Sequence, residues 1–277
     1  MPQDNAFGRL LRFWRAAFDL SQETLAERLE VSPRHISFLE NGRTTPSRGL
    51  VERLALDLQL GRRDAGNLLL AAGYLPRLVA SALEAPENAL LRRGLIETLR
   101  HLDPFAAAVI DPCANVKMVN RAWVVGNTRL FGAAVAGPRV NTIRLLVASA
   151  GWRRYVSDWA TLACLYLVLL EQEAILRSNL EAADLVQEII ADPAIPRDWA
   201  RRGASLASDG PNHVADVRGP DGKVRRLLNV HHTVGSTGYV SEPRLIIHAT
   251  FPEDGVPEIS REALSRLEDL SHPLLAY

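Results

Sequence analysis

Histidine is the residue type in this 277-residue chain whose positions first suggest chemistry. His231 and His232 are adjacent, and His213 and His248 could complete a metal site with them. The adjacent pair lies in a predicted strand, where neighbouring side chains point to opposite faces, so both can enter one site only at a bulge. We therefore expect hydrogen-bonded sheet histidines and no metal.

A catalytic site would need a nucleophile beside its base, or two acids in an apolar setting. Cys113 could pair with a histidine, but it lies in a predicted turn with no nucleophile motif around it. The glycines between residues 219 and 238 do not form a phosphate-binding loop before a helix. Cys113 and Cys164 have neither a disulfide framework nor metal-ligand spacing. The sequence therefore indicates no catalytic residue, no cofactor and no enzyme.

Residues 21 to 46 instead predict two short amphipathic helices joined by a tight turn. Ser21 is a capping side chain for the first helix. Ser32 followed by Pro33 is a second start signal, and Asn41 with Gly42 ends the second helix. This stretch organises the N-terminal part of the chain.

The second of these helices has an inverted polarity for a globular protein. At about 100° per residue, Glu40 falls on the apolar side with Ile36, while Arg34 and Phe38 face outward. The inversion is explained if the outward side enters a DNA major groove, where Arg can bind a guanine edge and Phe a thymine methyl. A buried Glu40 then needs a cation, and Arg15 on the preceding helix is the candidate. A plain helical hairpin with a solvated outer face is the alternative.

The same stretch resembles the Cro and phage-repressor class of helix-turn-helix domains, also called the xenobiotic-response-element (Xre) class. The matching residues are Gln22, Leu25, Ala26, Val31, Ser32, Ile36, Leu39, Glu40, Asn41, Gly42, Arg43 and Pro46. The resemblance implies phosphate contacts by Gln22, Asn41 and Arg43, and base contacts by Arg34, Ser37 and Phe38. Phe38 replaces the polar residue usual at its position. The whole implied DNA-binding set is Gln22, Ser32, Arg34, His35, Ser37, Phe38, Asn41 and Arg43.

Length and charge set limits on this interpretation. The length allows about two domains, and 47% hydrophobic with 23% charged residues indicates a globular chain. The net charge is zero, and residues 1 to 75 hold 10 Arg against 9 Asp or Glu. Three arginines against Glu40 alone lie between Ser32 and Arg48, which gives only a local basic surface. We expect weak nonspecific binding, and therefore a homodimer on a two-fold symmetric double-stranded operator.

The chain begins without a secretory signal pattern. Its longest apolar stretch, residues 160 to 170, is too short to span a bilayer. We expect a cytoplasmic protein with no membrane partner.

Five helices are expected in residues 1–75, forming a lambda-repressor-like bundle. Besides the two reading helices, apolar spacing predicts helices over residues 7 to 18 and about 62 to 72, and one that opens at Pro46 after Thr45. The segment LLLAAGYLP, residues 68 to 76, is similar to one in bacterial regulators that continue into an MmyB-like, PAS-like ligand-binding domain. Residues 76–87 are expected to be a partly helical linker, and residues 88–277 that second domain.

Residues 88 to 277 predict an α+β fold. A helix over 88 to 102 precedes strands over 106 to 110 and 116 to 120, and AAAVIDPCANVKMVNRAW resembles the opening PAS hairpin. Residues 141 to 191 read as helices with breaks near Gly151 and Asn179, and VSDWA resembles an MmyB-like phrase. Strands over 213 to 218, 225 to 234 and 244 to 250 follow, the first two joined by the turn GPDG, and a helix over 260 to 270 comes last.

The family resemblance implies a cavity that holds a small apolar ligand, plausibly a fatty acid. Its candidate lining is Val109, Met118, Trp123, Trp159, Tyr166, Leu228 and Val230, and Arg226 or His231 could meet a carboxylate at the mouth. The sequence thus predicts a dimeric, ligand-sensing transcription regulator. An antitoxin-like or adaptor protein whose second domain binds a protein partner is the alternative, and a DNA-tethered enzyme is a third.

Overall fold

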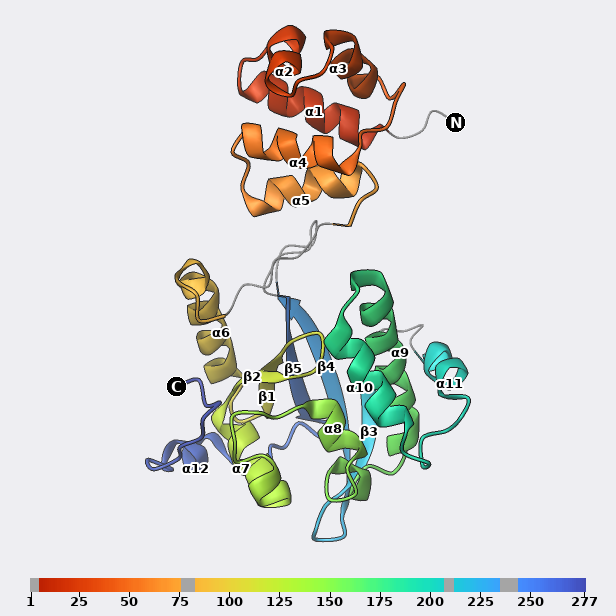
Figure 1. Cartoon of the computed structure of the whole chain (residues 1–277). Helices are drawn as coiled ribbons and strands as arrows, with labels where there is room; N and C mark the ends of the chain where they lie inside the picture. Colours follow the sequence, from red (N-terminus) through yellow and green to blue (C-terminus); the bar gives the residue numbers. More distant parts are fainter. Residues whose placement is uncertain (1–4, 76–82, 207–211, 235–243) are drawn as a thin grey trace. The chain divides into compact units, whose positions relative to one another are not determined.

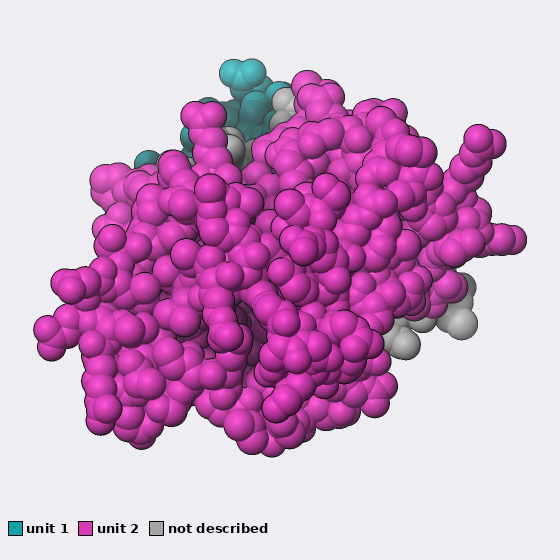
Figure 2. Space-filling model, turned by 90° about the horizontal axis from the view of Figure 1, so that it is seen from below, with its two compact units in different colours: residues 1–81, 235–242 teal, residues 82–234, 243–277 magenta. Residues whose placement is uncertain are grey.

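The structure, a computed structural model, describes residues 5–75, 83–206, 212–234 and 244–277. The chain divides into two compact units, coloured separately in Figure 2. Unit 1 contains the described residues up to 75, and unit 2 contains those from 83 onward. The expected linker spans residues 76–87, and its residues 76–82 lie outside the described residues.

Unit 1 consists of five helices, as the sequence predicts (Figure 1). They are α1 (Ala6–Ala17), α2 (Gln22–Arg28), α3 (Pro33–Glu40), α4 (Arg48–Asp57) and α5 (Arg62–Ala71). Ser21 and Ser32 cap α2 and α3 as expected, since each hydroxyl accepts a hydrogen bond from an amide of the first turn. The predicted start of α4 at Pro46 is wrong. Ser47 is its cap, and the carbonyl of Pro46 instead accepts a hydrogen bond from Tyr74 Oη at 2.9 Å.

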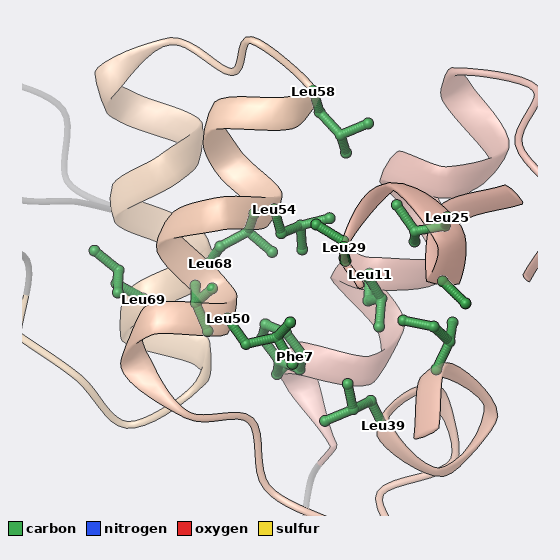
Figure 3. Packing of buried hydrophobic residues seen from close by; sticks show 13 residues of the cluster. Phe7, Leu11, Leu25, Leu29, Leu39, Leu50, Leu54, Leu58, Leu68 and Leu69 are labelled. Atoms are coloured by element: carbon green, nitrogen blue, oxygen red, sulfur yellow. The ribbon is translucent and has the colours of Figure 1, made fainter. Parts of the chain in front are cut away.

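One apolar cluster holds the five helices together. Side chains from α1, α2, α3, α4 and α5 converge in it, including Phe7, Leu25, Leu39, Leu54 and Leu68 (Figure 3). All five are at most 4% exposed. Burial of such side chains contributes about 1.5–3 kcal/mol each, so this cluster is the main stabilising contribution to the unit.

Asn5 connects the start of α1 to the end of α3 by hydrogen bonds. Its Oδ1 accepts from the amide of Gly8 at 2.8 Å, and its Nδ2 donates to the carbonyls of Leu39 and Glu40 at 3.3 and 3.0 Å. A Cβ at Gly8 would lie 2.5 Å from the Leu39 carbonyl oxygen and 2.2 Å from Asn5 Nδ2. Glycine is therefore required where the two helices approach.

Unit 2 is a mixed α/β domain. A 3-10 turn (Pro86–Asn88) and α6 (Ala89–Leu102) precede β1 (Ala107–Ile110) and β2 (Val116–Val119). Then come α7 (Arg121–Phe131), two 3-10 turns (Gly132–Ala134 and Trp152–Arg154), α8 (Thr142–Val147), α9 (Trp159–Arg177), α10 (Leu180–Ile190) and α11 (Trp199–Leu206). The chain finishes with β3 (His213–Arg218), β4 (Val224–Val234), β5 (Leu245–Pro252) and α12 (Arg261–Ser265).

The five strands form one antiparallel sheet in the order β2-β1-β5-β4-β3. The two N-terminal and three C-terminal strands and the hairpin after Arg218 agree with the PAS-like prediction. Asn120, expected after the second strand, caps α7 by accepting from Trp123 N at 2.9 Å. One local prediction is wrong, because the last helix ends at Ser265 rather than near residue 270. Helix α11 was not predicted from the sequence.

The two faces of the sheet are covered by different helices. Pairing register places Val109, Met118 and Ile247 on one face, where they pack with Leu95 and Leu99 of α6. The opposite face carries Ala108, Ile246 and His248 on β1 and β5. Helices α7 and α9 contact this second face, through Trp123 and Leu162 respectively.

Helix α9 is 19 residues long with a mean hydropathy of 1.4, so by length and composition it could cross a membrane, contrary to the shorter span predicted from the sequence. Six of its side chains are buried, and it packs with α8 and α10 in one apolar cluster. The helix therefore packs within unit 2 through part of its surface, while Ile175 and Leu176 near its end are exposed.

Gly8→Ala is expected to destabilise unit 1 by about 1–3 kcal/mol, because the new methyl group must displace the Leu39 carbonyl or Asn5. Gly49 in α4 is the matched control, since a Cβ there meets nothing within 4 Å. Gly49→Ala should stabilise the protein by about 0.4–1 kcal/mol. Urea unfolding of the full chain, with amide hydrogen exchange in α1 and α3, measures both. Equal effects of the two changes would contradict the close approach at Gly8.

Candidate DNA-binding surface and ligand-binding site

The carboxylate of Glu40 is buried at the centre of unit 1, with 1% of its side chain exposed. Arg15 Nε donates to Glu40 Oε1 at 2.6 Å and Arg15 Nη2 to Oε2 at 3.3 Å, which is the ion pair that the sequence predicts. Gln22 Nε2 also donates to Oε2 at 2.8 Å, and Arg12 Nε lies 3.5 Å from it. One carboxylate therefore joins α1, α2 and α3.

The charge on Glu40 is maintained despite its burial. Burial acts to raise the pKa of Glu40, but hydrogen bonds from Arg15 and Gln22, with the positive charges of Arg15 and Arg12, lower it below its ordinary value. The same hydrogen bond raises the pKa of Arg15. Because the pKa of Glu40 is lower in the folded state, its contribution to stability is complete above the ordinary Glu pKa of about 4.3 and is lost as pH falls below that value.

With Glu40 turned inward, the opposite side of α3 presents Arg34 and Phe38. The guanidinium carbon of Arg34 lies 5.0 Å from the centre of the Phe38 ring, and that of Arg43 lies 5.7 Å from it. Both arginines are exposed and Phe38 is half-buried. Two cations on one aromatic ring form a surface that can bind guanine edges, a thymine methyl and phosphates.

The other residues of the predicted DNA-binding set have local roles in the structure. Ser32 Oγ accepts from the His35 amide at 3.2 Å as the cap of α3. Asn41 Nδ2 donates to the Ser37 carbonyl at 2.8 Å. Gln22, expected at a phosphate, directs its amide nitrogen to Glu40.

Arg12 belongs to this surface but was not predicted. It is exposed, and its Nη2 lies 3.3 Å from Asn41 Oδ1 at the end of α3. Arg12 and Arg15 are three residues apart on one helix and therefore lie on the same face. This spacing in the sequence could have identified Arg12.

The residues predicted to line the ligand cavity do not lie together. Trp123, Trp159, Tyr166 and His231 lie on the α7 and α9 side of the sheet. The remaining five lie on the α6 side because of strand register: Val109, Met118, Arg226, Leu228 and Val230. Arg226 is exposed there and forms ion pairs with Asp216 and Glu253 at 3.3 and 3.9 Å. The nine residues therefore cannot line one cavity, since a sheet separates them.

The residues of the central strand are more exposed on the face under α9 than on the α6 face. On the central strand β5, Leu245, Ile247 and Ala249 are at most 8% exposed beneath α6. Their neighbours Ile246, His248 and Thr250 on the other face are only half-buried, although helices cover that face.

The same pattern appears on α9 itself. Leu162, Tyr166, Leu169 and Glu173 recur at helical spacing on the side toward the sheet, and all are half-buried. Six other side chains of α9, among them Cys164 and Leu167, are at most 8% exposed. A Cβ at Gly203 of α11 would lie 2.1 Å from the carbonyl oxygen of Cys164, so α11 packs closely against this part of α9. The side of α9 toward the sheet is thus more accessible to solvent than its buried side.

Six polar side chains gather between this side of α9 and the sheet, and we call them the polar strip: Tyr166, His213, Asn229, His231, His248 and Thr250. The rings of His231 and His248 stack with centroids 4.6 Å apart and 7° between their planes. Tyr166 from α9 contacts His213 and His231 with ring centroids 5.9 and 6.0 Å away. Cross-strand pairing of His231 with His248 explains the stack, and His232 faces away and is exposed, as strand alternation predicts.

The polar strip is held by its own hydrogen bonds and is electrically neutral at His248 and Tyr166. Asn229 Oδ1 accepts from Thr250 Oγ1 at 3.0 Å and lies 3.1 Å from His248 Nε2. Burial, with the neighbouring His231 and His213, lowers the pKa of His248 to about 3, and burial raises the pKa of Tyr166. At neutral pH these two side chains act as hydrogen-bonding groups without charge.

The polar strip does not have the geometry of a metal centre. Within the described ranges, no group of three His, Cys, Asp or Glu side chains could hold a metal ion. Cys113 lies in another apolar cluster, where burial raises the pKa of its thiol to about 12. A thiol with that pKa is not a nucleophile at neutral pH.

Arg15→Met should destabilise unit 1 by about 3–5 kcal/mol, because it leaves the Glu40 carboxylate buried without its main partner. The double variant Arg15→Met with Glu40→Met should recover most of that loss. Urea unfolding at pH 7 of both variants and Glu40→Met alone gives the coupling energy. Additive losses would contradict the ion pair. As a further check, wild-type stability should fall on acidification below about pH 4, and less so in the double variant.

Comparisons with known proteins identify a family for each of the two units. Residues 6–65 match a helix-turn-helix domain family, and residues 91–264 match the MmyB-like transcription regulator ligand binding domain. No curated protein matches the chain. Both matching families are families of transcription regulators rather than enzymes. The second match covers more than half of the chain, which therefore belongs to the MmyB-like transcription regulators, with an N-terminal helix-turn-helix domain.

Proposed function

We propose that the protein is a homodimeric, sequence-specific regulator that acts in the cytoplasm. Each copy places α3 in the major groove of one half of a two-fold operator, with the half-sites about 34 Å apart. The observation that carries this proposal is the inverted polarity of α3, with Glu40 buried and Arg34 and Phe38 outward. Base recognition in the major groove accounts for an Arg and a Phe on the outward side of this helix.

On this proposal the residues of the DNA surface have distinct roles. Arg34 binds a guanine edge through its two nitrogen donors, and Phe38 contacts an adjacent thymine methyl. Arg12 and Arg43 bind phosphates on either side of the reading helix. Glu40, Arg15 and Gln22 touch no DNA but fix the orientation of α3.

We further propose that the ligand of unit 2 has an apolar body and binds between α9 and the sheet. The half-buried side chains of the polar strip and the apolar residues beside it, Trp159, Leu162 and Ile246, support this location. A fatty acid is the ligand that the family resemblance suggests. The ligand would regulate DNA binding by favouring one arrangement of the dimer, which requires different affinities for the two arrangements.

Arg34→Ala is expected to weaken binding to a selected operator by about 1–3 kcal/mol and to relax preference at one base position. Arg12→Ala should instead weaken binding to all sequences alike and reduce the salt slope by about one. Selection from a randomised duplex library, followed by titrations at several salt concentrations, measures both. An equal loss on operator and random DNA would contradict the role of Arg34.

Native mass spectrometry of the purified protein tests the ligand-sensing proposal. We expect a homodimer that releases a small molecule with an apolar body on denaturation, and operator affinity that changes when this molecule is removed and restored. A homodimer that binds the operator but releases nothing would contradict sensing by a bound metabolite and would favour a protein partner as the signal.

A further inference from the structure

We propose that two copies of the chain associate through the part of the sheet that β3 and β4 form on its α6 side. This surface would be the interface of the homodimer proposed above, on which the inference rests. We call it the open face, and it takes alternate residues from the two strands: Val214, Asp216, Arg218, Val224, Arg226 and Leu228.

The open face is accessible because α6 covers other strands. The side chains of α6 pack against residues of β1, β2 and β5. On β3 and β4, all six residues of the open face are exposed. The apolar ones are Val214, Val224 and Leu228, whose exposed fractions are 49%, 50% and 40%. A second molecule can therefore reach this surface.

The polarity of β4 is inverted at the open face. In an antiparallel sheet with one solvated side, apolar residues point inward and polar residues outward. Here Asn229 is only 9% exposed, whereas Leu228 before it is exposed on the other side. His231 likewise lies on the α9 side, and Val230 does not. Leu228 lies opposite Val214 in the register, so the two form an exposed apolar pair. Contact with a partner accounts for such a pair.

The charges of the open face are balanced. Asp216 lies opposite Arg226, with 3.3 Å between Asp216 Oδ1 and Arg226 Nε. Glu253, directly after β5, places its Oε2 3.9 Å from Arg226 Nη1. Arg218 adds a second cation, so two arginines accompany two carboxylates. The paired side chains are at least 48% exposed, so these contacts are weak and can be exchanged for contacts with another molecule.

A second copy of the chain is the partner that fits these features. A two-fold interface places one surface against itself, so that surface must carry both signs of charge. The Val214–Leu228 pair then packs against its counterpart, and each arginine can approach a carboxylate of the other copy. A nucleic acid would require a net positive charge, which the open face lacks.

Leu228→Lys tests the apolar contact, with Leu180→Lys at the start of α10 as its matched control. Both variants change an exposed leucine of unit 2 to lysine, and Leu180 is the more exposed, at 78%. Sedimentation velocity of the full chain over a concentration series measures the dissociation constant of the dimer. Leu228→Lys should raise this constant about tenfold or more, because a lysine would be buried in the interface. Leu180→Lys should leave it unchanged. No rise for Leu228→Lys, or an equal rise in both variants, overturns the inference.

Charge reversal gives a second result, which misfolding cannot produce. One variant carries Asp216→Arg with Glu253→Arg, and the other carries Arg218→Glu with Arg226→Glu, so each open face has a single sign. All four side chains are exposed, so the fold should tolerate the changes. Each variant alone should dimerise about tenfold or more weakly than wild type, because like charges meet.

An equimolar mixture of the two charge variants should recover a dimer with one copy of each, since opposite charges then face each other. Native mass spectrometry identifies this mixed dimer by its mass. Dimerisation of each variant at wild-type strength, or a mixture that forms no more mixed dimer than random pairing gives, overturns the inference.

The failure of the proposed homodimer has a different signature. If the wild-type chain is a monomer both in solution and on its operator, the homodimer is wrong, and the inference fails with it. If wild type is a dimer that persists in every variant, the homodimer stands and only this surface is wrong. Binding of a different protein at the open face of a wild-type monomer overturns both.

Discussion

The buried carboxylate of Glu40 is the interaction on which the DNA-binding domain depends. A charge removed from water is expensive, so it persists only where several donors meet it. Arg15 and Gln22 supply those donors from two other helices, which fixes the reading helix at a defined angle. The cost of burying Glu40 is offset by these contacts. The result is that Arg34 and Phe38 remain at the surface, where DNA can reach them.

The ligand-binding domain obeys a different constraint, set by its sheet. Helix α6 covers one face with apolar side chains, which pack against Val109, Met118 and Ile247. The other face is covered by helices but keeps half-buried imidazoles beneath α9. Polar side chains inside a domain must satisfy one another or a ligand. Asn229 provides the first kind of partner for Thr250 and His248.

Local signals in the sequence predicted most of the secondary structure. Capping residues located the starts of α2 and α3, and β3 was predicted with its observed ends. The ion pair of Glu40 with Arg15 was also predictable, because an acidic residue on an apolar helix face needs a cation. The errors occurred where a local signal competed with packing. Pro46 looked like a helix start, but its carbonyl is engaged by Tyr74 and Ser47 is the cap.

The sequence by itself determined the helix-turn-helix, its outward arginine and phenylalanine, and the places of the five strands along the second domain, because caps, turns and apolar periods are local. Only the tertiary structure decided which side chains share a site. His213, His231 and His248 come from three strands, and antiparallel register brings their rings together. The same register separates Val109 and Met118 from Tyr166, although all are apolar or aromatic. Pairing between distant strands depends on the whole sheet, and no single stretch of sequence encodes it.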